Sequence, residues 1–161
     1  MKNFRIRIIT LTGILFLLAL APLGLSAQEQ GGSQNPLADL QSTDPYTQIT
    51  GCRKVGEAKN SQAVQPLIQL LETSSNREVQ WNAALALGMI GQAGPATDAL
   101  LKSAKGSGYK SVRYASLLGL ANLQDPNKKS EFMDVVTWTQ ESSNDDLAKD
   151  LVEKIRSKAG I

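Results

Sequence analysis

Residues 76–91 read NREVQWNAALALGMIG, and residues 109–123 read YKSVRYASLLGLANL. The two stretches match when Val79 is placed on Val112, 33 residues later. In the first stretch, apolar residues recur at i, i+4, i+7, i+8 and i+11 from Val79, which places them on one face of an α-helix. Agreement at a fixed offset predicts a protein built from repeated helical units.

Weaker copies of the pattern extend the predicted array in both directions. Upstream, Cys52 and Gly56 lie 35 residues before Leu87 and Gly91, so we expect them at equivalent places. Downstream, residues 147–155 have the spacing of one last amphipathic helix. Its expected apolar face carries Leu147, Leu151 and Ile155.

Each unit also contains a second amphipathic segment. Its apolar residues are Val64, Leu67, Ile68 and Leu71 in the first unit, Leu100, Leu101 and Ala104 in the next, and Phe132, Val135, Val136 and Thr139 in the third. A helix pair of this size cannot bury both of its faces alone, so neighbouring pairs must stack. The sequence therefore predicts an all-α fold, a short α-solenoid made of a superhelix of stacked antiparallel helix pairs, with about three and a half repeats.

Residues 79–91, with an Ala-Ala pair followed by Leu-Gly and Ile-Gly, resemble a HEAT repeat. More narrowly, they are similar to the short HEAT-like repeat first named from phycobilisome lyases. The resemblance extends from about Asp44 to the C-terminus, although Gln80 replaces the usual arginine of the motif. It implies a HEAT/armadillo-like superhelix with the second helices on its concave side and a protein-binding surface. It does not imply one activity, because fold and function are separate inferences.

The N-terminus resembles a secretory signal peptide. Three basic residues precede an uncharged apolar run over residues 8–20, and a stretch of small residues ends at Ala27. We expect a signal peptide over residues 1–27, a flexible Gln-, Gly- and Ser-rich tether over residues 28–43, and a HEAT-like repeat domain over residues 44–161. The alternative is an uncleaved membrane anchor, since the apolar run approaches spanning length. The expected location is the periplasm, with secretion as the alternative and no stable membrane anchor once the signal is cleaved.

Charge argues against a nucleic-acid partner. The full chain has 17 basic and 15 acidic residues, and residues 1–27 hold three of the basic residues and none of the acidic ones. The mature chain therefore carries a net charge of about −1, whereas a nucleic-acid platform needs a basic excess to neutralise phosphates. Another protein is the expected partner.

The residue types for catalysis are scarce. The chain has no histidine, which is the commonest general base and metal ligand. Cys52 is the only cysteine and is interpreted as a small buried apolar residue, with a cross-link to a partner as the alternative if it is exposed. Asp145 and Asp146 precede a predicted helix and are interpreted as helix-capping residues. We expect no enzymatic activity, no cofactor and no metal.

Several large apolar residues lie off the predicted core face. Trp81, Leu85 and Met89 follow one another by one helical turn, and Tyr114 and Leu118 match the first two in the next repeat. Trp and Tyr are enriched at binding hot spots, so we interpret this set as a partner-binding strip. Its members are Tyr46, Trp81, Leu85, Met89, Tyr114 and Leu118. The alternative is that the strip packs against the tether or thickens the contacts between repeats.

The second helices offer another candidate surface. Its residues are Gln62, Gln65, Gln69, Asp98, Lys102, Lys105, Glu131, Asp134 and Trp138. The mixture has no single sign of charge, which favours polar protein contacts over capture of a charged ligand.

These observations predict an exported, non-enzymatic interaction scaffold or adaptor that binds another protein. One alternative is a lyase-like or chaperone-like factor that acts on a protein-bound pigment or cofactor, as the resemblance to the phycobilisome lyases implies. Another alternative is a structural subunit of a larger cell-envelope complex.

Overall fold

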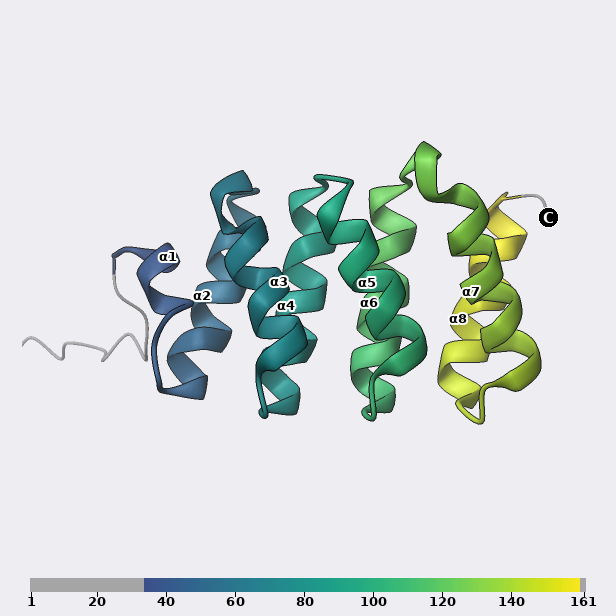
Figure 1. The fold of residues 1–161 in the computed structure, drawn as a ribbon, viewed down its shortest axis with the longest axis horizontal. Coiled ribbons are helices and arrows are strands. Elements are labelled where there is room, and N and C mark those ends of the chain that lie inside the picture. Colours follow the sequence, from purple (N-terminus) through teal and green to yellow (C-terminus); the bar gives the residue numbers. More distant parts are fainter. Residues whose placement is uncertain (1–33, 160–161) are drawn as a thin grey trace, which may run out of the picture.

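The computed structural model describes residues 34–159, and these residues form only helices and connecting turns (Figure 1). The helices are α1 (Pro36–Asp39), α2 (Pro45–Glu57), α3 (Val64–Thr73), α4 (Arg77–Ile90), α5 (Pro95–Gly106), α6 (Lys110–Leu123), α7 (Lys129–Ser142) and α8 (Asp146–Ala159). Short 3₁₀ helices precede α3 and α7, at Ser61–Ala63 and Pro126–Lys128. The predicted all-α fold is confirmed.

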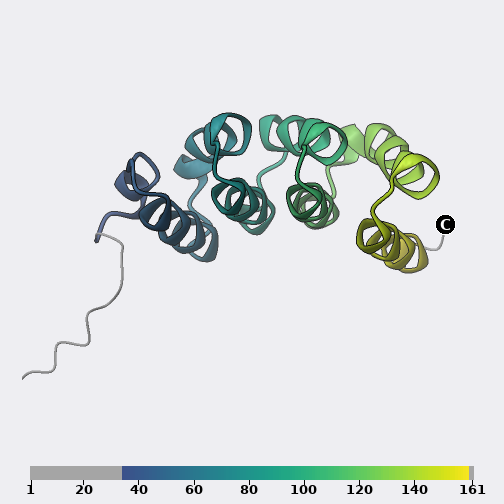
Figure 2. The same cartoon turned by 90° about the horizontal axis from the view of Figure 1, so that it is seen from below.

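The helices form two layers. We call α2, α4, α6 and α8 the first layer and α3, α5 and α7 the second layer (Figures 1 and 2). Each helix of the first layer is followed by an antiparallel partner in the second layer, except α8, which ends the array. The described part of the chain therefore contains three helix pairs and a half, as predicted.

Side-chain caps fix where three of the four first-layer helices start, whereas Tyr109, before α6, makes no capping hydrogen bond with its side chain. The Asp44 carboxylate accepts the amide of Thr47 at 2.8 Å, and Asn76 accepts the amides of Glu78 and Val79 at 2.8 and 3.2 Å. Such side-chain caps satisfy amides that have no partner inside the helix. We call Asp44, Asn76, Tyr109 and Asp145 the cap residues and count positions in each first-layer helix from them.

The predicted register of the first repeat is wrong by one helical turn. The cap residues Asp44 and Asn76 are 32 residues apart, not 35. Gly56 is therefore equivalent to Gly88, and Ile49, instead of Tyr46, is equivalent to Trp81.

Small residues bring the first-layer helices close together. A Cβ atom added to Gly88 would lie 2.5 Å from the Cα atom of Gly119, and one added to Gly56 would lie 3.1 Å from the Cα atom of Ala86. These two contacts are equivalent in successive repeats, at the α4/α6 and α2/α4 boundaries. Helix axes approach this closely only where a side chain is missing or minimal.

The close approach in the first layer sets the curvature of the array. Seen along the helices, the array is an arc, and the first layer follows its inside while the second-layer helices stand further apart on its outside (Figure 2). The expectation that the second helices line the concave side is therefore wrong for this protein. The concave face belongs to α2, α4, α6 and α8.

The core lies between the two layers. Its largest fully buried side chains include Leu67, Leu87, Leu100 and Leu117. Truncation of such a leucine to alanine typically costs about 2–5 kcal/mol, because it leaves a cavity as well as losing apolar contact. Cys52 is also fully buried, as predicted, and burial raises the pKa of its thiol to about 12.

The packed part of the chain begins ahead of Asp44, inside the segment for which a tether is predicted. Leu40 is buried, and α1 lies against α2, where a Cβ atom added to Gly51 would approach the Cβ atom of Asp39 to 2.8 Å. The physical reason is that residues 37–40 supply two leucines that cover the first face of α2. The predicted signal peptide and residues 28–33 of the predicted tether lie outside the described residues. Among residues 34–159, no helix has the length and apolar character needed to cross a membrane.

The last helix confirms two of the three residues predicted for its apolar face, since Leu151 is buried and Ile155 packs against the core. Ala148, Leu151 and Val152 are buried, whereas Leu147 is 60% exposed. Asp145 caps this helix by accepting the amide of Ala148 at 3.3 Å, which confirms the predicted role of Asp145.

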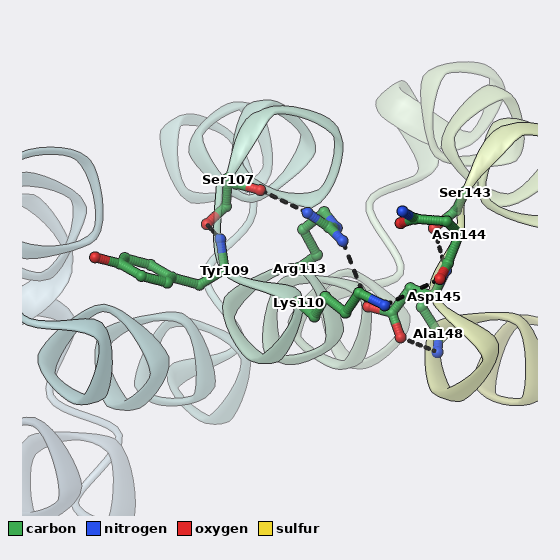
Figure 3. Close-up of polar contacts among 8 residues, drawn as sticks. All are labelled: Ser107, Tyr109, Lys110, Arg113, Ser143, Asn144, Asp145 and Ala148. Atoms are coloured by element: carbon green, nitrogen blue, oxygen red, sulfur yellow. Dashed lines mark hydrogen bonds and ion pairs between the residues drawn. The ribbon is translucent and has the colours of Figure 1, made fainter.

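Polar contacts join α6 to the start of α8 (Figure 3). One guanidinium nitrogen of Arg113 donates to the carbonyl oxygen of Ser107 at 2.8 Å, and the other lies 3.6 Å from the Asp145 carboxylate. Lys110 donates to the carbonyl oxygen of Asn144 at 3.0 Å. The Arg113 and Asp145 side chains are only 15% and 5% exposed, so this ion pair is largely shielded from water.

Candidate functional site on the concave face

Helical geometry places four positions of each first-layer helix on the concave face. In α4 the core-facing residue is Val79, three residues after the cap residue. Each residue turns the helix by about 100° around its axis. The positions 2, 5, 9 and 13 residues after the cap therefore lie at roughly 200° to 280° around that axis from the direction of Val79. They therefore face away from the second layer, toward the inside of the arc (Figure 2).

The centre of the concave face is apolar. On α4 it carries Trp81, Leu85 and Met89, and on α6 it carries Tyr114 and Leu118. We call these five residues the concave patch. Met89 is 42% exposed, and the other four side chains are half-buried and pack against the core.

The two aromatic residues of the concave patch contact each other. The ring centroids of Trp81 and Tyr114 are 6.3 Å apart, and the ring planes differ by 9°, which is a stacked arrangement. Aromatic pairs of this kind contribute about 0.5–1.5 kcal/mol beyond their buried area. The pair therefore stabilises the α4/α6 boundary and also leaves part of both rings on the concave face, so the patch has a structural as well as a surface role.

Tyr46 lies on the same face but outside the concave patch. It is 52% exposed and stands two residues after its cap, one turn nearer the helix start than Trp81. Leu147 occupies the equivalent place on α8. The sequence interpretation missed Leu147 because it assigned that residue to the buried face. Leu147 stands two residues after its cap residue Asp145, as Tyr46 does after Asp44, and this spacing would have placed it on the concave face.

Charged residues border the concave patch on both sides. At the position nine residues after the cap, where α4 and α6 have Leu85 and Leu118, α2 has Arg53 and α8 has Lys154. Lys154 pairs with Asp150 at 2.6 Å, and this hydrogen bond raises the pKa of Lys154. An apolar centre inside a charged rim is the usual layout of a protein-binding surface.

The polar surface predicted on the second helices lies on the convex side. A hollow of about 310 Å³ opens between α3 and α5, where Lys102 pairs with Glu72 at 2.8 Å and Tyr109 forms one wall. A second hollow of about 780 Å³ lies beside α3, and four glutamines are among its lining residues. In the first hollow the charges of Glu72 and Lys102 offset each other, and the second hollow has Glu72 as its one charged lining residue, so neither has the strong field that would select a charged ligand.

Metal-binding residues do not gather in the part of the chain that the structure describes. Among residues 34–159, no three His, Cys, Asp or Glu side chains lie close enough to hold a metal ion.

A comparison with protein-family models matches residues 35–121 to the model for HEAT repeats. The match runs from the start of α1 to near the end of α6 and thus includes both helices that carry the concave patch. A search of curated proteins found no match to the chain.

Proposed function

The chain belongs to the HEAT-repeat family, and from this premise we propose that it is an exported, non-enzymatic scaffold or adaptor that binds another protein through the concave patch. HEAT repeats generally mediate protein–protein interactions, which supports the class of partner. The basic residues and uncharged run within residues 1–20 support export.

One observation carries the proposed binding site. Five large apolar side chains gather on the open side of α4 and α6, where a helix face that meets only water is normally polar. Contiguous apolar surface with a polar rim marks interaction sites in soluble proteins. Trp81 and Tyr114 supply the residue types that dominate binding energy at such sites.

The test compares two double variants in affinity purification from the native envelope. Leu85→Gln with Met89→Gln makes the concave patch polar at similar side-chain volume. Gln65→Ala with Gln69→Ala alters two exposed residues of α3 on the convex side and serves as the matched control. Circular dichroism and thermal melting establish that both variants are folded.

We expect the partner to co-purify with the wild type and the control but not with the patch variant. With the purified partner, calorimetry should give at least about a tenfold higher Kd for the patch variant, since hot-spot truncations cost about 2 kcal/mol or more. Equal affinity for the wild type and the patch variant, with loss in the control, would move the site to the convex side.

A further inference from the structure

We infer that Met89, at one end of the concave patch, is a site of reversible oxidation. A hydroperoxide converts its thioether to the sulfoxide, and that end of the patch becomes polar while the fold is kept. The loss of partner binding that follows from this change rests on the proposed function. The selectivity for Met89 and the retention of the fold do not depend on it.

Exposure distinguishes Met89 from the other sulfur-containing side chains. The chain has three methionines and one cysteine, and Met1 lies within residues 1–27, which the proposed export removes. Met89 is 42% exposed on α4, whereas Met133 of α7 is half-buried and packs against the core. Cys52 is fully buried, and its raised pKa keeps the thiol protonated and unreactive. A dissolved oxidant therefore meets the side chain of Met89 first.

The neighbouring helix α2 has a glycine where it passes the sulfur of Met89. A Cβ atom added to Gly56 would lie 3.4 Å from that sulfur. Any side chain at residue 56 would therefore contact the sulfur and shield it from the solvent. The glycine that lets α2 approach α4 at Ala86 thus also leaves the Met89 sulfur free of a covering side chain from residue 56.

The reaction needs the hydroperoxide and no other co-reactant. A lone pair of the sulfur attacks the terminal oxygen of the hydroperoxide, so an S–O bond forms as the O–O bond breaks. The leaving oxygen takes the proton of the transferred oxygen and departs as water, or as an alcohol from an organic hydroperoxide. The sulfur loses two electrons and the hydroperoxide gains them. The product is a polar sulfoxide, which methionine sulfoxide reductases return to the thioether.

The other repeats show that the fold accepts a polar side chain at this place. Met89 stands 13 residues after its cap residue. At the equivalent position the other first-layer helices have exposed polar residues, namely Glu57, Asn122 and Lys158. A sulfoxide at Met89 therefore differs from one in a core, where it disrupts packing. What changes is the surface, because one of the five apolar side chains of the concave patch becomes polar.

The experiment treats the protein purified from its native envelope with hydrogen peroxide. Met89→Leu removes the proposed site, and Met133→Leu removes the half-buried methionine as the matched control. Each protein is compared with its own untreated sample. Peptide mapping by mass spectrometry locates the sulfoxide, circular dichroism follows the fold, and hydrophobic-interaction chromatography reports the polarity of the surface.

We expect the sulfoxide to appear at Met89 before Met133. Treated wild type and treated Met133→Leu should elute earlier from the hydrophobic column, and treated Met89→Leu should not shift. The melting temperature of the oxidised wild type should stay within about 4 °C of the untreated value, and reductase treatment should restore the elution position.

Partner binding should follow the same pattern. With the purified partner, oxidation should raise the Kd at least about tenfold for the wild type and for Met133→Leu, because a polar group replaces part of an apolar contact surface. Peroxide should leave the Kd of Met89→Leu at its own untreated value. Methionine sulfoxide reductase should reverse the change in the wild type.

The other outcomes separate this inference from the proposed function. Equal rates of oxidation at Met89 and Met133, or an oxidised wild type that unfolds, overturn the inference. Oxidation at Met89 with an unchanged Kd, while the Leu85→Gln, Met89→Gln variant loses the partner, overturns the effect on binding and leaves the scaffold function standing. If oxidation is selective and shifts the elution, but the Leu85→Gln, Met89→Gln variant binds like the wild type, the proposed binding site fails and the oxidation site remains.

Discussion

Two glycines in the first layer leave no room for a side chain where α4 meets α6. The distance of 2.5 Å from a Cβ atom on Gly88 to the Cα atom of Gly119 is shorter than any contact that such atoms tolerate. The clashing atom belongs to the backbone of Gly119, so it cannot move away by a rotamer change as a side-chain atom could. A single methyl group at this place must push two helices apart, and the Trp81–Tyr114 stack at the same boundary would be disturbed with it.

We therefore expect Gly88→Ala to destabilise the protein by about 1–3 kcal/mol, the range observed for overpacked sites. Thermal unfolding followed by circular dichroism should show a melting temperature lower by several degrees. Gly106→Ala is the matched control, because a Cβ atom there meets nothing within 4 Å, and it should be neutral or slightly stabilising. If both variants melt alike, the close contact between α4 and α6 does not exist in solution.

At the scale of elements, the boundary between α6 and α8 differs from the two before it. Gln80 and Arg113 are equivalent and make equivalent hydrogen bonds, to the carbonyl oxygens of Ser74 at 2.7 Å and Ser107 at 2.8 Å. The arginine is longer than the glutamine and carries a positive charge. It therefore reaches the next repeat, where it pairs with Asp145. An ion pair therefore adds to the apolar contacts of the last half-repeat, whereas the earlier first-layer boundaries have close glycine and alanine contacts.

Arg113→Gln reproduces the arrangement at Gln80 and removes the ion pair. We expect a loss of about 1–3 kcal/mol, because the Asp145 carboxylate stays buried without its positive partner. Hydrogen exchange should quicken most in α7 and α8. A double-mutant cycle with Asp145→Asn should give a coupling energy of about 0.5 kcal/mol or more. Additive effects of the two substitutions would show that the 3.6 Å pair contributes nothing to docking.

The repeats differ in how well the sequence predicted the position of their helices, because they carry different sequence signals. The match of Val79 to Val112 rests on many positions, and the structure confirms it. The first repeat was misplaced because an amphipathic pattern nearly repeats after a shift of one turn, so its apolar residues alone do not fix the register. The side-chain cap at Asp44 does fix it.

The side of the arc on which the binding strip lies could not be predicted from the sequence. Curvature depends on how closely neighbouring helices approach, and that distance is set by the contact between Gly88 and Gly119 across two repeats. The helical spacing of Trp81 and Leu85 correctly separated them from the core-facing residues. It did not show whether they would face the inside or the outside of the array.

For the whole molecule, the proposed removal of residues 1–27 during export is open to a direct test. The described array begins with α1 at Pro36, eight residues after the expected first residue of the mature chain, Gln28. The expected cleavage site after Ala27 therefore precedes the packed helices in the sequence.

We expect the protein isolated from the native envelope to start at Gln28, with a mass lower by that of residues 1–27. N-terminal sequencing and intact-mass spectrometry of the periplasmic fraction measure this directly. Ala27→Arg is expected to block processing, because the protease requires a small residue before the cut. A chain that keeps Met1 and sediments with membranes would establish the uncleaved anchor instead.

Because its two layers are spaced unequally, the array should be stiff on its concave side and more extensible on its convex side. In the first layer, α2, α4 and α6 touch through backbone at Gly56/Ala86 and Gly88/Gly119, so these three helices resist both compression and sliding. The second-layer helices stand further apart and are held by side chains, so they carry most of any change in length (Figure 2). Flexing the array therefore changes its radius while the distances among Trp81, Leu85 and Tyr114 stay nearly constant. A partner that binds the concave patch as proposed would therefore meet the same contact surface at different radii of the array.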